Sequence, residues 1–244
     1  MKSYNALAQF YDYLTENVDY EVRSDYISNF FSEYGNGGKK LLDLACGTGT
    51  FSQKFYDLGY DVTGVDLSVE MLTVAKSKLP DISFINADMT DFSFGEKFDY
   101  CICMLDSINH LTNYEDVIKC FNRAYDCLTD NGLFIFDVNT PYKHKNVLGN
   151  NTFVFDEDDF FLSWDNEYAN DCVNIFLDFF VFNSKNYDRF SENFTERAYS
   201  IDVLKAALSK FKIIGIYDEL SLDEPRLDSE RLYFVCKKEN EWVR

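Results

Sequence analysis

Three aspartates each stand at the end of a short apolar run in the first half of the sequence: Asp43, Asp66 and Asp88. Such runs are typical of buried strands, and the carboxyl ends of parallel strands meet at one edge of a sheet, where ligands bind. Carboxylates gathered at that edge favour a cationic ligand over a pyrophosphate. The spacing therefore predicts a crevice for a positively charged small molecule.

The stretch from Leu41 to Thr50 is the most informative part of the chain. An apolar strand runs into a loop with Gly47 and Gly49, and a helical pattern follows. Glycines allow the backbone to approach a ligand, and the free N–H groups at a helix start face it. We expect a ligand at this turn, with a tight turn that binds nothing as the alternative.

Two other ligand classes are weighed against this loop. A dinucleotide fingerprint requires G-x-G-x-x-G, but Ser52 stands where the third glycine would be. A phosphate-binding P-loop is excluded because the Gly-Lys-Ser/Thr ending is missing. Asp66, about 20 positions after the loop, could accept both ribose hydroxyls, but a dinucleotide domain would show this too. An NAD(P)-binding oxidoreductase thus remains an alternative.

The segment from Asp43 to Gly49 resembles the first motif of class I S-adenosylmethionine-dependent methyltransferases, with Ala45 at the usual first glycine. The resemblance implies that Gly47, Gly49 and this loop hold the methionyl part of the cofactor, with Asp43 near its amino group. Residues 86–89 resemble the family's adenine site, in which Asp88 accepts from the exocyclic amine and Met89 supplies the adjoining backbone. The implied cofactor is S-adenosylmethionine, bound without a metal.

Further members of the predicted cofactor site follow the second and fourth strands or lie near the N-terminus: Leu67, Met71, Met104, Tyr11 and Tyr20. The segments around Tyr11 and Tyr20 resemble the tyrosine motifs of the sugar-nucleotide N,N-dimethyltransferase subgroup, whose N-terminal helices cover the cofactor. Residues 194–200 resemble its return strand. Ordinary helix packing is an equal alternative for both tyrosines.

The polar run after the fourth strand, from Asp106 to His110, is where an acceptor-handling group is expected. The run resembles the same subgroup, and His110 is the matching histidine. An imidazole can orient or deprotonate an amine near neutral pH, but methyl transfer needs mainly alignment and exclusion of water. His110 is therefore the candidate catalytic residue, with a loop-bracing role as the alternative; His144 is a weaker candidate.

The acceptor is expected to be a small molecule methylated on nitrogen or oxygen. A noncatalytic cofactor-binding module is the alternative from another class, and the retained polar run argues against it.

Alternating strand and helix patterns predict the scaffold that positions these residues: a doubly wound, seven-stranded, mostly parallel α/β sheet. The predicted strands are Leu41–Ala45, Asp61–Val65, Ile82–Asn86, Tyr100–Met104, Leu133–Val138, Lys212–Asp218 and Arg231–Lys237. Two amphipathic helices are predicted within residues 3–34. The helices predicted after them are Phe51–Leu58, Val69–Lys78, Tyr114–Leu128 and Ile201–Lys210. Ser68 is the expected N-cap of the helix that starts at Val69.

After Pro141 the alternation stops, and aromatic, β-branched runs predict four antiparallel strands: Phe153–Asp156, Phe160–Tyr168, Val173–Phe182 and Arg189–Arg197. The chain is thus expected to consist of a helical lid (1–38), a cofactor-binding core (39–140), an antiparallel insertion (141–199) and a return to the core sheet (200–244). The insertion would cap the acceptor pocket or form a homodimer.

Composition narrows the remaining functions. A net charge of −19 disfavours nucleic-acid partners, which require a basic surface. The seven cysteines form an odd set without zinc-ligand spacing, so we expect reduced thiols and no metal. No stretch approaches the roughly 18 apolar residues of a spanning helix. We expect a cytoplasmic protein that does not bind membranes.

Overall fold

The computed structural model describes residues 5–158 and 160–239 and contains a seven-stranded core sheet with the strand order β10-β11-β5-β4-β1-β2-β3. The strands are β1 (Lys40–Leu44), β2 (Asp61–Asp66), β3 (Ser83–Asn86), β4 (Phe98–Cys103), β5 (Leu128–Asn139), β10 (Lys212–Asp218) and β11 (Arg231–Lys237). The first five pair in parallel, and β11 is antiparallel to β5 and β10. The doubly wound, mostly parallel fold is confirmed, and the strand order reverses between β1 and β4.

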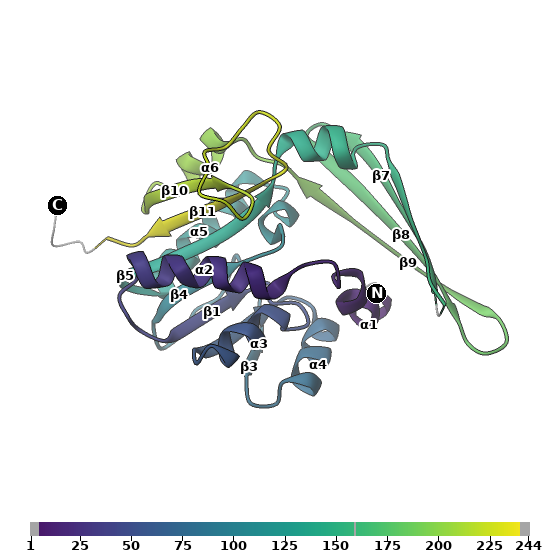
Figure 1. Ribbon diagram of the computed structural model, residues 1–244, viewed down its shortest axis with the longest axis horizontal. Coiled ribbons are helices and arrows are strands. Elements are labelled where there is room, and N and C mark those ends of the chain that lie inside the picture. Colours follow the sequence, from purple (N-terminus) through teal and green to yellow (C-terminus); the bar gives the residue numbers. More distant parts are fainter. Residues whose placement is uncertain (1–4, 159, 240–244) are drawn as a thin grey trace.

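Helices cover both faces of this sheet (Figure 1). One face carries α2 (Tyr20–Tyr34), α3 (Thr50–Asp57) and α4 (Val69–Lys78), and the other carries α5 (Tyr114–Cys127) and α6 (Ile201–Ala207). Because side chains alternate along a strand, Leu41 of β1 packs towards α2 and α3, whereas Leu42 and Leu44 pack towards α5. Burial on both faces explains why the strands read as continuous apolar runs.

Local sequence signals set several boundaries as expected. The Ser68 hydroxyl accepts a hydrogen bond from the Met71 N–H at 3.1 Å, which confirms the N-cap of α4. Two elements differ most from the prediction. Helix α6 stops at Ala207 because the chain turns at Leu208, whose carbonyl accepts from the Phe211 N–H at 2.8 Å. Strand β5 already begins at Leu128, which pairs with Phe98 of β4 before a register shift.

The insertion forms a separate antiparallel sheet, the arm, which extends from the core (Figure 1). Its strands are β6 (Thr152–Asp156), β7 (Phe160–Ala169), β8 (Cys172–Phe182) and β9 (Tyr187–Arg197). Asn170 and Asp171 turn β7 into β8 with left-handed backbones (φ 53° and 62°), as a two-residue hairpin loop requires. A short π-helix, η2 (Lys143–Leu148), joins β5 to the arm and was not predicted.

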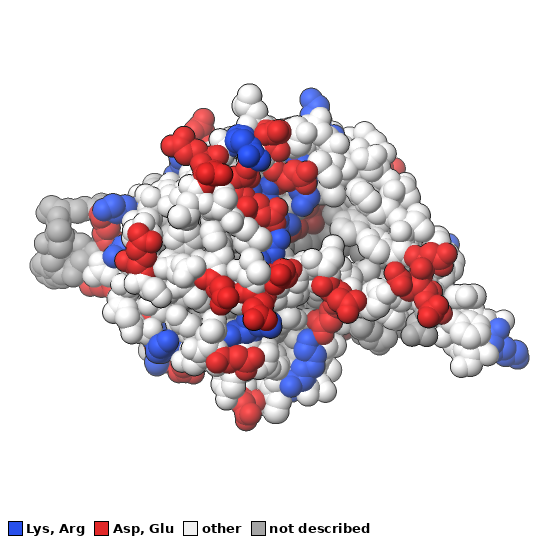
Figure 2. Space-filling view, in the orientation of Figure 1, with Lys and Arg blue, Asp and Glu red and all other residues white. Residues whose placement is uncertain are grey.

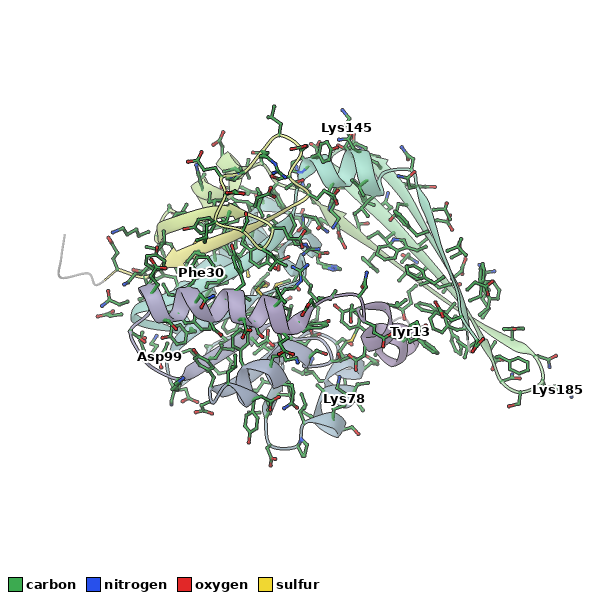
Figure 3. All side chains as sticks on the ribbon, viewed as in Figure 1. Tyr13, Phe30, Lys78, Asp99, Lys145 and Lys185 are labelled. Carbon is green, nitrogen blue, oxygen red and sulfur yellow. The ribbon has the colours of Figure 1, made fainter. Side chains whose placement is uncertain are left out.

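Helix α1 (Asn5–Leu14) lies between the core and the arm (Figure 1). The Phe10 ring lies 5.0 Å from that of Phe160 and 5.8 Å from that of Phe179, and Tyr13 meets Phe160 edge-on (Figure 3). The predicted helical segment began at Ser3, and its first two residues lie outside the described part of the chain. Among the described residues, no helix is both long and apolar enough to cross a membrane.

Candidate active site

The loop after β1 is held open by left-handed backbone conformations at Ala45 (φ 55°), Gly47 (φ 55°) and Gly49 (φ 81°). The two glycines serve different purposes. A Cβ atom on Gly49 would lie 2.9 Å from the side chains of Leu79 and Phe84, so this glycine is required for packing. A Cβ on Gly47 would meet only the Tyr11 ring, at 3.8 Å, so Gly47 borders space that a ligand can fill.

Asp66, at the end of β2, connects this loop to the next helix. Its Oδ2 accepts a hydrogen bond from the Gly47 N–H and its Oδ1 one from the Ser68 N–H, both at 2.8 Å. Each carboxylate oxygen keeps further acceptor capacity. Asp66 is therefore oriented by the backbone of both turns and can still accept hydrogen bonds from a pair of hydroxyls.

Both predicted tyrosines cover a cavity of about 20 Å³ at the end of β1, here called the cofactor cavity. Its lining contains six predicted residues: Tyr11, Tyr20, Asp43, Ala45, Gly47 and Met104. It also contains five residues that sequence reasoning missed: Cys46, Thr48, Thr50, Phe51 and Leu105. Four of these five adjoin the loop glycines or the helix start, so the motif could have indicated them. The cavity holds about one water molecule in this conformation, and both tyrosines form part of its wall.

The carboxyl group of Asp43 is buried against this cavity, with 2% of the residue exposed. The Ser52 hydroxyl donates to its Oδ2 at 2.6 Å, so the residue at the third-glycine position has a role of its own. Burial raises the pKa of Asp43 to about 7 although the hydrogen bonds from Ser52 oppose the shift. No described residue forms an ion pair with Asp43, so a cationic ligand would supply the missing counter-charge.

Asp12 attaches helix α1 to the rim of the cofactor cavity. Its carboxylate accepts hydrogen bonds from the hydroxyls of Thr48 and Thr50 and forms an ion pair with Lys78 of α4. Lys78 lies on the outer side of α4, facing α1 (Figure 3). One side chain thus joins α1 to the glycine loop, to the start of α3 and to α4.

The remaining predicted cofactor residues do not line this cavity. Oδ1 of Asp88 accepts from the N–H and the hydroxyl of Thr90, at 2.8 and 2.7 Å, which is the geometry of a turn residue. Leu67 is 69% exposed, and Met71 is buried against α1 and the arm. Met89 packs against the α5 side of the core. Their contacts with a cofactor stay predictions.

Beside the cavity, β4 is followed by two consecutive left-handed residues, Leu105 (φ 54°) and Asp106 (φ 51°). Such backbones cost roughly 1–2 kcal/mol each. An ion network opposes this cost: Arg231 of β11 donates to Asp106 Oδ1 at 2.6 Å and also to Asp137 of β5, which accepts from the Asp106 N–H at 3.2 Å. Sequence reasoning found Asp106 but not its partners, which come from distant strands.

Both histidines of the chain converge on one buried carboxylate. Nε2 of His110, at the end of the 3₁₀-helix η1 (Ser107–His110), lies 3.7 Å from Oε1 of Glu196 on β9. Nε2 of His144, in η2, lies 3.4 Å from Oε2 of the same residue. The His144 side chain is fully buried, whereas that of His110 is 41% exposed and packs on Phe194. Of the two histidines, only His110 therefore combines access to solvent with a nearby carboxylate.

Comparison with known proteins agrees with this geometry. A family model described as "Methyltransferase domain" matches residues 41–132. The chain is 32% identical over 243 residues to "Putative methyltransferase YqeM" of Bacillus subtilis (strain 168), a match that covers 96% of this chain and 97% of that one. It is 36% identical over 112 residues, 45% of this chain and 47% of the other, to dTDP-3-amino-3,4,6-trideoxy-alpha-D-glucopyranose N,N-dimethyltransferase of Streptomyces venezuelae.

The structural comparison extends over nearly the whole chain. The crystal structure of a S-adenosylmethionine-dependent methyltransferase from Clostridium acetobutylicum ATCC 824 superposes with a TM-score of 0.89 at 33% identity, over 97% of this chain and 99% of that one. Fold, glycine loop and full-length similarity thus agree, and the methyl donor is S-adenosylmethionine. The chain belongs to the class I S-adenosylmethionine-dependent methyltransferases.

Proposed function

We propose that this enzyme methylates a nitrogen or oxygen atom of a small-molecule acceptor, which binds between Leu105 and His110. The observation that carries the proposal is the junction at the end of β4: Met104 and Leu105 line the cofactor cavity, and the polar run with His110 follows directly. Similarity to an amino-sugar N,N-dimethyltransferase and to a glycine/sarcosine N-methyltransferase of Aphanothece halophytica supports a small acceptor.

In this proposal, the cofactor is held by the residues around the cavity. Gly47 admits it to the loop, Asp43 faces its ammonium group, and Asp66 accepts from its ribose hydroxyls. Asp88 and Met89 contact the adenine. Bound S-adenosylmethionine supplies a methyl group on a cationic sulfur, which departs as a neutral thioether. Tyr11 and Tyr20 close the cavity, which excludes water and keeps the reacting atoms aligned.

His110 is the proposed acceptor-handling residue. Nε2 of His110 lies 3.7 Å from the Glu196 carboxylate, so a ring with its proton on Nε2 would leave the lone pair of Nδ1 free for the acceptor. A lone pair at this position can orient an amine or accept the proton that a methylated amine or hydroxyl releases. Glu196 acts on the reaction only through His110 and is a positioning residue.

We further propose that the chain is organised as lid (1–38), core (39–140), insertion (141–199) and return (200–244), and that the arm caps the acceptor site. Glu196 supports the cap, because this arm residue reaches His110 of the core. Dimerisation through exposed arm aromatics such as Phe176 and Phe182 is the competing role.

The seven free cysteine thiols support a reducing compartment such as the cytoplasm.

Calorimetry and turnover test the proposed function. S-adenosylmethionine should bind at one saturable site, and Asp66→Ala should weaken it by about tenfold or more, since a hydrogen bond to a charged group is lost. NADH should not bind. A panel of amines and hydroxyl compounds should then yield S-adenosylhomocysteine with at least one member. Methylation of proteins or nucleic acids alone would contradict the small-molecule acceptor.

A further inference from the structure

His144, in η2, is the histidine to which the proposed function gives no role. Its side chain is fully buried, and neither Nδ1 nor Nε2 forms a hydrogen bond with a described residue. Buried polar groups are nearly always hydrogen-bonded. Nε2 lies 3.4 Å from Oε2 of Glu196, a buried oxygen that also has no hydrogen bond within the described part of the chain. This distance is only slightly longer than an ordinary N–H···O bond of about 2.7–3.2 Å, so a small rotation would pair the two side chains.

Hydrogen bonds tie the helix η1 to the end of β9. The side chain of Asn109 is fully buried, and its amide group donates to the carbonyls of Asn139 and Arg197, both at 3.0 Å. Its oxygen accepts from the Asn139 N–H at 2.9 Å. Just after β9, the Tyr199 hydroxyl donates to the Leu111 carbonyl, which follows η1. These bonds hold η1 and this end of the arm together, so a side chain near the end of β9 keeps its position relative to the histidine of η1.

Glu196 faces one imidazole with each of its carboxylate oxygens. Oε1 lies 3.7 Å from Nε2 of His110, and Oε2 lies 3.4 Å from Nε2 of His144. The side chain of Glu196 is 5% exposed, and among the described residues no lysine or arginine forms an ion pair with it. Figure 2 shows Lys and Arg side chains instead interspersed with Asp and Glu along the middle of the core. A buried carboxylate needs hydrogen-bond donors, and two imidazole N–H groups can supply one to each oxygen.

We propose that His144 is a positioning residue, which donates its Nε2 proton to Oε2 of Glu196 and thereby keeps Oε1 turned towards His110. A carboxylate held at both oxygens has a fixed plane, whereas one held at a single oxygen can rotate. A proton on Nδ1 of His144 would instead set the Nε2 lone pair against the carboxylate, which is repulsive. The effect on turnover rests on the proposed function, because it acts through His110; the contact itself does not. The competing role for His144 is packing alone, in which its shape matters and its N–H does not.

NMR of the imidazole rings tests the contact, because the chain has only two histidines to resolve. Protein made with nitrogen-15-labelled histidine is saturated with S-adenosylhomocysteine and held at about pH 8, where an ordinary imidazole is neutral. Both rings should carry their proton on Nε2.

Two variants separate the N–H of His144 from its bulk. In His144→Leu, which has no donor, the ring of His110 should interchange between its two tautomers. Turnover of an acceptor from the panel should fall about tenfold with unchanged cofactor affinity. His144→Gln, whose amide can donate to Glu196, should restore both. The matched control is Lys145→Met: Lys145 belongs to the same helix but is exposed and points away from the molecule (Figure 3), so its loss should change neither the tautomers nor the turnover.

The outcomes separate this proposal from the proposed function. A proton on Nδ1 of His144 in the wild type would overturn the positioning role, and so would wild-type tautomer and turnover in His144→Leu. If His144→Gln is folded by circular dichroism but behaves as His144→Leu does, packing alone explains the residue and the proposal fails. The wild-type spectrum decides the contact even if His144→Leu does not fold. If the wild type binds no S-adenosylhomocysteine or methylates no member of the panel, the proposed function fails instead, and the tautomers still decide the contact.

Discussion

Replacing Asp43 by asparagine tests whether the buried carboxylate of β1 serves a cationic ligand. It also tests whether this carboxylate lowers the stability of the folded protein. Asp43 is 2% exposed, and the Ser52 hydroxyl donates to it at 2.6 Å. The asparagine side chain has nearly the same shape, and its carbonyl oxygen can still accept from Ser52. The substitution therefore removes the charge and leaves the packing almost unchanged.

The size of the effect follows from the pKa of Asp43, which burial raises from 3.8 to about 7. This difference corresponds to about 4 kcal/mol. Below about pH 4 the carboxyl group is protonated in both the folded and the unfolded chain and costs nothing. As the pH rises towards 7, the unfolded chain loses its proton first, so the folded state loses stability. Above about pH 7 the full cost of about 4 kcal/mol is present.

The Asp43→Asn variant has no such dependence, so it should exceed the wild type in free energy of unfolding by about 4 kcal/mol near pH 8 and by almost nothing near pH 4. Urea denaturation of both cofactor-free proteins across this range measures the difference. The stabilised variant should also bind S-adenosylmethionine about tenfold or more weakly, because it lacks the counter-charge for the cation. Equal stability of the two proteins near pH 8 would refute the burial argument. Unchanged affinity would refute the contact with the cofactor.

Other predictions concern the acceptor side, the lid and the loop. His110→Ala should lower the turnover rate by about 100-fold while calorimetry shows unchanged cofactor affinity; full turnover would make His110 structural. Asp12→Ala removes the contacts of α1 with Thr48 and Lys78, so stopped-flow fluorescence should show faster cofactor association and dissociation; unchanged rates would mean that the lid opens elsewhere. Ala45→Gly relieves the strain of a left-handed backbone at a non-glycine residue. It should raise the free energy of unfolding by up to about 1 kcal/mol in urea denaturation. A lower free energy of unfolding would contradict the expected strain at Ala45.

The core sheet could be predicted from the sequence because its signals are local. A strand buried on both faces reads as an apolar run, and the N-cap Ser68 marks the start of α4 at the correct residue. The glycine loop indicated the position of the cavity for the same reason. The packing that requires glycine at position 49 could not be read from the loop, because Leu79 and Phe84, which leave no room for a Cβ atom, come from elsewhere in the chain.

The acceptor side was less predictable because its geometry depends on contacts between distant segments. Asp106 meets Arg231 across 125 positions of sequence, and no pattern around either residue indicates the other. Glu196 belongs to an arm strand, yet it joins His110 and His144 from two other elements. The motif resemblance pointed to His110 but could not show which carboxylate lies beside it.

The fold carries two costs near the cofactor cavity. Asp43 is a buried carboxylate with no ion pair to a described residue, and Leu105 and Asp106 hold left-handed backbones. A cationic methyl donor would supply the counter-charge for Asp43, so cofactor binding should stabilise the folded enzyme beyond its direct contacts.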